Sequence, residues 1–253
     1  MKKLIIILSL FTIFLNCVSA ATVKTVSKDY KVVTSDGFGM TATLEYPKIK
    51  EKNEFATVVL LHSIGYSSQW WEKLPSDLLD NGYAVLKIDL RGHGNSIYTN
   101  NLNRVSWANL TNKAFSKYPD DVITMIDYVK SENKRVFFNN WAIVGSDIGA
   151  GTAIYVANQI QYKPKTIVML SPIVKAKGLY VPVKLAELDN IDILSITGAT
   201  DINGVAANEY LKKFAQSTFA EYTSESKSTG MILLKHDKTL SKVITSWIVQ
   251  YLK

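Results

Sequence analysis

The sequence predicts an α/β protein with a mostly parallel, twisted sheet that is covered by helices on both faces. Three observations lead to this prediction. Short, continuous apolar runs recur along the chain, as is typical of strands buried on both faces. Segments with helical apolar periodicity separate these runs. The chain has 253 residues, 47% of them apolar, which suits one large domain with a sizeable core.

The first structural element expected along the chain is an antiparallel hairpin. Apolar and polar residues alternate over residues 31–34 and again over residues 40–46. Ser35, Asp36 and Gly37 lie between these stretches and form a turn signal.

Strands and helices then alternate toward the C-terminus. Strands are expected at residues 57–61, 83–88, 141–144, 166–170 and 193–196. Helices are expected at residues 70–79, 120–129, 148–160, 205–214 and 238–252. In a sheet of this kind, functional groups gather beyond the carboxyl ends of the strands. The segments that directly follow the apolar runs are therefore the places to search.

The first twenty residues have the pattern of a secretory signal peptide. Lys2 and Lys3 precede an apolar run over residues 4–15, and small residues end at Ala20. The run is shorter than the roughly 20 residues that a membrane span needs. We therefore expect residues 1–20 to be removed and residues 21–253 to form one exported domain, periplasmic or secreted.

Cys17 is the only cysteine, so the chain has no disulfide framework. Acylation of Cys17 would instead give a lipoprotein anchor, although Asn16 is a poor match to the small residue usual before such a cysteine. No other stretch is long and apolar enough to span a membrane. The net charge is +7, but the lysines are scattered without interleaved aromatic residues, which indicates no nucleic-acid partner. No pattern indicates an oligomeric state.

The strongest motif is Gly-Ser-Asp-Ile-Gly at residues 145–149, which directly follows a predicted strand and opens a predicted helix. This is the setting of a nucleophile elbow, whose glycines permit a very tight turn. Asp147 stands at the tip, where serine is usual. Ser146 would point away from the tip because it is the last residue on the strand side, so we do not expect it to be the nucleophile.

Four segments together resemble the α/β-hydrolase superfamily: residues 60–62, 81–85, 89–96 and 145–150. The similarity is greatest to small, uncapped bacterial proteins related to dienelactone hydrolases and short-chain esterases. It extends from residue 57 to the C-terminus. The resemblance implies an α/β-hydrolase fold without a large cap domain.

The resemblance also implies site residues. Backbone N–H groups of Ile64 and Ile148 would form the oxyanion hole. Asp201 follows a late strand and would be the acid, and His236 precedes the last helix and would be the histidine. Asp192 and Asp237 are rival acids. Neither a cofactor nor a metal is implied, and the expected partner is a small-molecule substrate.

Aspartate at the elbow leaves two functions open. In the similar haloalkane dehalogenases and epoxide hydrolases, aspartate attacks an sp³ carbon. Those enzymes carry Trp where this chain has Ile148, and a cap for which residues 171–190 are too short. The first hypothesis is a hydrolase of a small ester-like or related substrate, with an Asp147, His236 and Asp201 constellation. The second is a binding or interaction protein that has lost turnover, because two carboxylates near one imidazole favour its protonated form, which cannot act as a base.

Overall fold

The computed structural model describes residues 23–50, 52 and 54–252. The predicted signal peptide at residues 1–20, with Cys17 in it, lies outside the described residues. Both therefore stay predictions.

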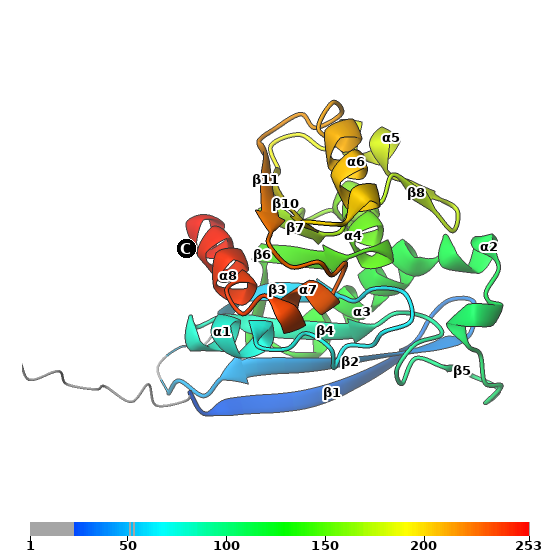
Figure 1. The fold of residues 1–253 in the computed structure, drawn as a ribbon. Helices are drawn as coiled ribbons and strands as arrows, with labels where there is room; N and C mark the ends of the chain where they lie inside the picture. The colour runs from blue at the N-terminus through cyan, green and yellow to red at the C-terminus, as the bar shows by residue number, and fades with distance from the viewer. Residues whose placement is uncertain (1–22, 51, 53, 253) are drawn as a thin grey trace, which may run out of the picture.

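A mixed sheet forms the centre of the molecule (Figure 1). Its strand order is β1-β2-β4-β3-β6-β7-β10-β11, with β5 paired beside β2. The strands from β4 to β11 in this order are parallel, whereas β1 and β2 are antiparallel. The predicted mostly parallel sheet with an N-terminal hairpin is confirmed. The strands of the sheet are β1 (Thr25–Val33), β2 (Phe38–Pro47), β3 (Phe55–Leu61), β4 (Ala84–Asp89), β5 (Tyr98–Thr99), β6 (Val136–Ser146), β7 (Thr166–Leu170), β10 (Asp192–Gly198) and β11 (Phe219–Ser224).

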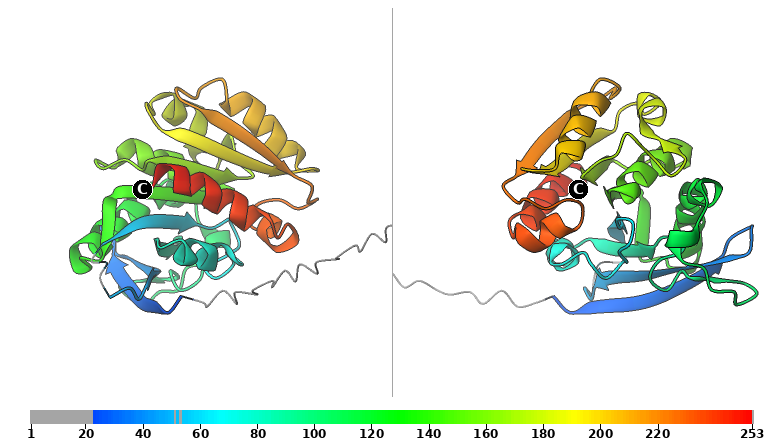
Figure 2. Two further views of the ribbon diagram at one scale, coloured as in Figure 1. Left: turned by 90° about the vertical axis from the view of Figure 1, so that its left-hand side faces the viewer. Right: turned by 45° about the vertical axis from the view of Figure 1, so that its right-hand side comes forward.

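Helices cover both faces of the sheet (Figure 2). One apolar cluster joins the sheet to α3, α4 and α5, and a second joins the other face to α1 and α8. This two-sided burial is why the central strands read as continuous apolar runs. None of the described helices combines the length and the apolarity needed to cross a bilayer. The helices are α1 (Leu74–Asp80), the 3-10 turn η1 (Trp107–Asn109), α2 (Asn112–Phe115), α3 (Tyr118–Glu132), α4 (Ile148–Gln159), α5 (Val181–Ala186), α6 (Ile202–Leu211), α7 (Ile232–His236) and α8 (Leu240–Tyr251).

Several boundaries differ from those predicted. Helix α1 begins four residues late, with a proline in its first turn, where proline needs no N–H partner. Helix α6 begins three residues early because Asp201 caps it. Strand β11 and a small hairpin of β8 (Lys175–Ala176) and β9 (Leu179–Tyr180) were not predicted. Strand β11 lies at the sheet edge with alternate residues exposed, so it has no continuous apolar run.

The segment after β4 braces the fold. The Asp89 carboxylate accepts the Ser68 N–H at 2.7 Å and so fixes the loop after β3. The Arg91 guanidinium donates two hydrogen bonds to Asp121 of α3, at 2.8 and 2.7 Å, and two more to Asp36 of the hairpin turn. A buried arginine with two carboxylate partners ties the hairpin, α3 and the sheet together.

Candidate functional site

The turn from β6 into α4 has the tight geometry predicted for a nucleophile elbow. Asp147 lies at its tip with φ 53° and ψ −116°, a left-handed conformation that is strained for a residue with a side chain. A Cβ on Gly145 would lie 2.3 Å from the Gly149 carbonyl oxygen, and one on Gly149 would lie 2.1 Å from the Leu61 carbonyl oxygen. The two flanking positions therefore exclude every side chain.

The Asp147 carboxylate occupies the donors predicted for the oxyanion hole. Its Oδ2 accepts the Ile64 N–H at 3.2 Å, and the Ile148 N–H also hydrogen-bonds this side chain. Burial raises the pKa of Asp147, the two N–H donors oppose that rise, and the nearby Asp201 charge adds to it. Asp147 is thus a desolvated carboxyl group held by backbone dipoles.

Asp201 reaches the same region from the end of β10. Its Oδ1 accepts the Gly204 N–H at 2.9 Å and caps α6. Its Oδ2 has no hydrogen-bond partner within the described part of the chain, although the residue is only 6% exposed. A buried carboxylate oxygen without a donor carries a desolvation cost.

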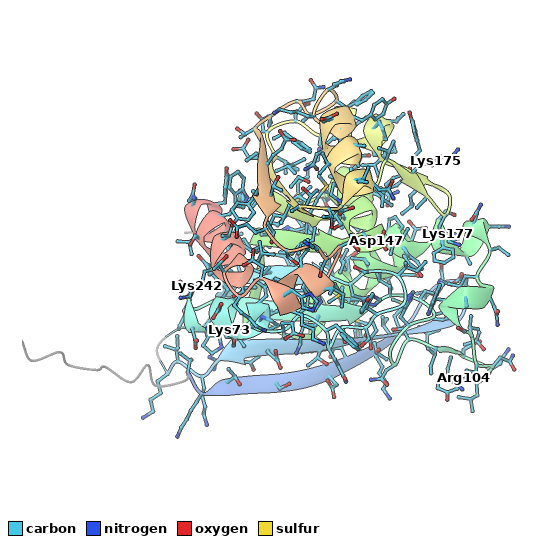
Figure 3. The ribbon with its side chains drawn as sticks, in the orientation of Figure 1. Lys73, Arg104, Asp147, Lys175, Lys177 and Lys242 are labelled. Atoms are coloured by element: carbon cyan, nitrogen blue, oxygen red, sulfur yellow. The ribbon has the colours of Figure 1, made fainter. Side chains whose placement is uncertain are left out.

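Asp147 and Asp201 line one cavity of about 400 Å³. Segments that are far apart in sequence meet here, because each follows a strand at the carboxyl edge of the sheet. Figure 3 shows Asp147 in the middle of the molecule, at the start of α4. The other lining residues are Ser63, Ile64, Tyr66, Ser171, Pro172, Ile173, Asn203, Gly204, Thr229 and Gly230.

His236 does not line this cavity, in contrast to the triad predicted from the sequence. It ends the short helix α7, its side chain is exposed, and its Nδ1 is hydrogen-bonded to Ser228 Oγ at 2.7 Å. Leu233 and Leu234 bury the inner face of α7. The loop before α7 reaches the cavity instead, through Thr229 and Gly230.

Gly230 holds this loop in place. Its N–H donates to Ser171 Oγ at 2.6 Å, and a Cβ added to it would lie 2.8 Å from Ser63 Oγ. Sequence reasoning missed Thr229 and Gly230 because it did not identify β11, the strand whose carboxyl end they follow. A glycine shortly before an apolar helix start was the available signal.

The comparisons with known proteins agree with this architecture. The profile of the family described as serine aminopeptidase, S33, matches residues 52–201, more than half of the chain. The chain belongs to this family. It is a hydrolase of the α/β-hydrolase superfamily, with an esterase-like fold. A search of the curated proteins found no match.

Solved structures share the fold of this hydrolase at low sequence identity. An esterase from Pyrococcus furiosus superposes with a TM-score of 0.69 at 13% identity, over 90% of this chain and 92% of the esterase. A dienelactone hydrolase from Anabaena variabilis gives 0.65 at 16% identity, over 90% and 99% of the two chains. A hydrolase from Pseudomonas aeruginosa gives 0.68 at 14% identity, over 87% and 98%.

The alternative nucleophile and the alternative acids considered from the sequence form hydrogen bonds outside the cavity. Ser146 is fully buried and its Oγ lies 2.7 Å from Ser63 Oγ, beneath the elbow. Asp192 accepts the Tyr251 hydroxyl at the opposite end of β10, and Asp237 accepts the Ser224 hydroxyl at 2.6 Å. None of Ser146, Asp192 and Asp237 lines the cavity.

The other two histidines are structural. Leu90 N–H donates to His62 Nε2 at 2.9 Å, and His62 Nδ1 is hydrogen-bonded to the Ser63 carbonyl oxygen at 2.8 Å. Gly65 N–H donates to His93 Nε2 at 2.9 Å. Both imidazoles accept a backbone N–H and are therefore neutral. They hold the loop that supplies the Ile64 N–H.

These histidines predict a loss of stability in acid. Burial, and secondarily the neighbouring His93, lower the pKa of His62 from 6.5 to about 4. Between pH 6.5 and pH 4, His62 is therefore protonated in the unfolded chain and neutral in the folded chain. The free energy of unfolding should fall by about 3 kcal/mol from this group as the pH drops from 6.5 to 4. Urea unfolding at pH 7.5, 6.5, 5 and 4 measures it.

His62→Gln supplies the control for this measurement. Glutamine keeps an acceptor and a donor but does not titrate in this range, so the variant should show a flatter dependence of stability on pH. Equal pH dependence of wild type and variant would contradict the assignment of the loss to His62.

Proposed function

We propose that this hydrolase is exported and cleaves a small ester-like or related substrate with Asp147 as the nucleophile. Export rests on the charged start and apolar run of residues 1–20, and the first residue of the mature protein, expected to be Ala21, tests it. The observation that carries the activity is the position of Asp147. Its carboxylate stands at the elbow tip, faces the cavity and is bound by the backbone donors of Ile64 and Ile148.

This position suits a carboxylate that forms and then loses an ester. Oδ1 of Asp147 attacks a saturated carbon of the substrate, in an ester the alkyl carbon bonded to the ester oxygen; a new C–O bond forms as the bond to the leaving group breaks, and the leaving group departs with the bonding electron pair. Oδ2 then becomes the carbonyl oxygen of the new ester, already bonded to the Ile64 N–H. Water adds to that carbonyl carbon, and the negative charge develops on Oδ2, where the Ile64 N–H stabilises it. Collapse restores the carboxylate and releases the product.

Asp201 is the group available to accept the proton of that water. Asp201 lines the same cavity, and its Oδ2 has no hydrogen-bond partner in the described residues, whereas His236 does not line the cavity. A carboxylate that lies beside the attacking water can accept its proton. In this proposal Asp201 takes the role that His236 was predicted to fill.

The test is turnover in H₂¹⁸O over a panel of activated esters, lactones, epoxides and haloalkanes. We expect hydrolysis of at least one class, with ¹⁸O entering the peptide that contains Asp147, since water attacks the ester carbonyl of that side chain. Asp147→Asn and Asp201→Asn should each lower the rate at least about a hundredfold. Asp120→Asn, an exposed carboxylate on α3, is the control and should retain the wild-type rate.

Turnover that survives in Asp147→Asn would contradict the assigned nucleophile. Label found in the product alone would place the attack of water on the substrate and not on Asp147. Turnover that requires His236 would contradict the assigned role of Asp201.

A binding protein without turnover is the second candidate. Two observations favour it: Asp147 itself occupies the oxyanion donors, and His236 lies outside the cavity. A small molecule that protects the folded chain against heat, with no hydrolysis anywhere in the panel, would select this candidate.

A further inference from the structure

A second cavity adjoins the one that Asp147 lines. Its volume is about 340 Å³, which falls at the lower end of the range of small-molecule sites, roughly 300–1,000 Å³. Tyr66 lines both cavities, and Ile64 of the first is followed in the chain by Gly65 of the second. A substrate group that is attached to the reacting carbon and long enough to pass Tyr66 would enter this second cavity.

Two tryptophan side chains give the second cavity an aromatic wall. Trp70 is 45% exposed and meets the Tyr66 ring edge-on, with ring centroids 5.3 Å apart. Trp107 is partly buried and stacks on the His93 ring at 5.6 Å. Neither tryptophan belongs to the two apolar clusters of the core. Aromatic surface that lies outside the core and lines a cavity is suited to a flat apolar ligand.

The second cavity also carries a positive charge. Arg104 lines it, is exposed, and forms no ion pair within the described part of the chain. Figure 3 shows Arg104 at the periphery of the molecule, away from Asp147. The described lining residues include no Asp, Glu or Lys, and His93 is neutral because its Nε2 accepts the Gly65 N–H. An unpaired guanidinium matches the geometry of a carboxylate, which it binds through two parallel hydrogen bonds.

The two adjoining cavities therefore differ in charge. Asp147 and Asp201 line the first, and Arg104 lines the second. An anionic group is repelled by the two carboxylates and attracted by the guanidinium. A substrate with one anionic end would accordingly enter with that end in the second cavity and its other end toward Asp147.

We propose that the second cavity binds an aromatic carboxylate, with its ring against Trp70 and Trp107 and its carboxylate facing Arg104. The inference rests on the proposed function only in making this group a part of the substrate. It then names the substrate class: compounds that carry an aromatic acid group remote from the bond that is cleaved.

Binding of 2-naphthoate to the ¹⁵N-labelled protein at pH 7 tests this proposal. The reporters are the indole N–H signals of Trp70 and Trp107, and both should shift saturably. The indole N–H of Trp247 donates to Thr166 Oγ1 outside this cavity and should not shift. 2-Naphthamide has the same shape without the charge and should bind at least about tenfold more weakly. Decahydro-2-naphthoate keeps the charge but lacks the flat ring and should bind at least about threefold more weakly.

Arg104→Gln is the matched variant for the charge. It should raise the dissociation constant of 2-naphthoate at least about tenfold and leave that of 2-naphthamide unchanged. Lys242→Gln removes an exposed cation on α8, far from Arg104 in Figure 3, and should change neither value. Trp70→Leu should weaken both ligands at least about threefold, because both use the ring. Both replaced side chains, Arg104 and Trp70, are exposed, so the variants should fold.

Three results would overturn the proposal: equal affinity for 2-naphthamide, an unchanged dissociation constant in Arg104→Gln, or no shift at Trp70 and Trp107. The part that the ligand plays in turnover is tested separately. 2-Naphthoate should compete with any substrate that the panel identifies, and at least about tenfold more weakly in Arg104→Gln. Binding without hydrolysis anywhere in the panel would defeat the proposed function alone. Hydrolysis without binding of 2-naphthoate would defeat this inference alone.

Discussion

Asp147→Ser is expected to leave the rate on p-nitrophenyl acetate at background, whereas Asp147→Ser/Thr229→His should raise it at least about a hundredfold. Serine needs a neighbouring base, and the described cavity contains no histidine. Thr229 lies on the loop after β11 and lines the cavity with Asp147 and Asp201. A histidine there would line the same cavity as positions 147 and 201, and the Ile64 and Ile148 N–H groups would be free to bind the oxyanion.

Two further variants separate the contributions. Adding Asp201→Asn to the double variant should remove most of the gain. A carboxylate at this position orients the introduced imidazole and stabilises its protonated form during the reaction. Asp147→Ser/His236→Ala should equal Asp147→Ser, since His236 is bonded to Ser228 outside the cavity. A rate in Asp147→Ser that depends on His236 would show that His236 reaches the elbow after all.

Gly149→Ala is expected to destabilise the fold by more than about 4 kcal/mol. The added Cβ would lie 2.1 Å from the Leu61 carbonyl oxygen and 2.7 Å from that of His62. Both atoms are backbone, and relief requires α4 to move away from the end of β3. That movement would separate packed core surfaces and shift the Ile64 donor. Urea unfolding followed by circular dichroism measures the loss.

Gly151→Ala, two residues along the same helix, is the control. Its added Cβ would meet the Ile173 Cδ1 atom at 3.0 Å, the flexible end of a side chain. Alanine also has the better helix propensity, by up to about 1 kcal/mol, so this variant should unfold near the wild-type denaturant concentration. Equal midpoints for the two variants would contradict the backbone clash at Gly149.

The strands and the elbow could be predicted from local sequence. A strand buried on both faces must be apolar along its length. The strands at residues 57–61 and 166–170 can therefore be predicted from their apolar runs alone. The elbow can be predicted from its flanking glycines, because the turn leaves no space for a Cβ at those two positions. Asp201 could also be predicted, because it directly follows an apolar strand at the carboxyl edge.

Only the tertiary structure decided which residue after β11 lines the cavity with Asp147. His236 and Thr229 both lie between the last strand and the last helix, and no local pattern distinguishes them. The path of this loop depends on contacts distant in sequence: the Gly230 N–H with Ser171, and the burial of Leu233 and Leu234 against the sheet. These contacts bring Thr229 to the cavity and turn His236 outward. Residue type and spacing report what a segment can form, whereas the direction of a side chain in a connecting loop is set by the surfaces that the rest of the fold presents to it.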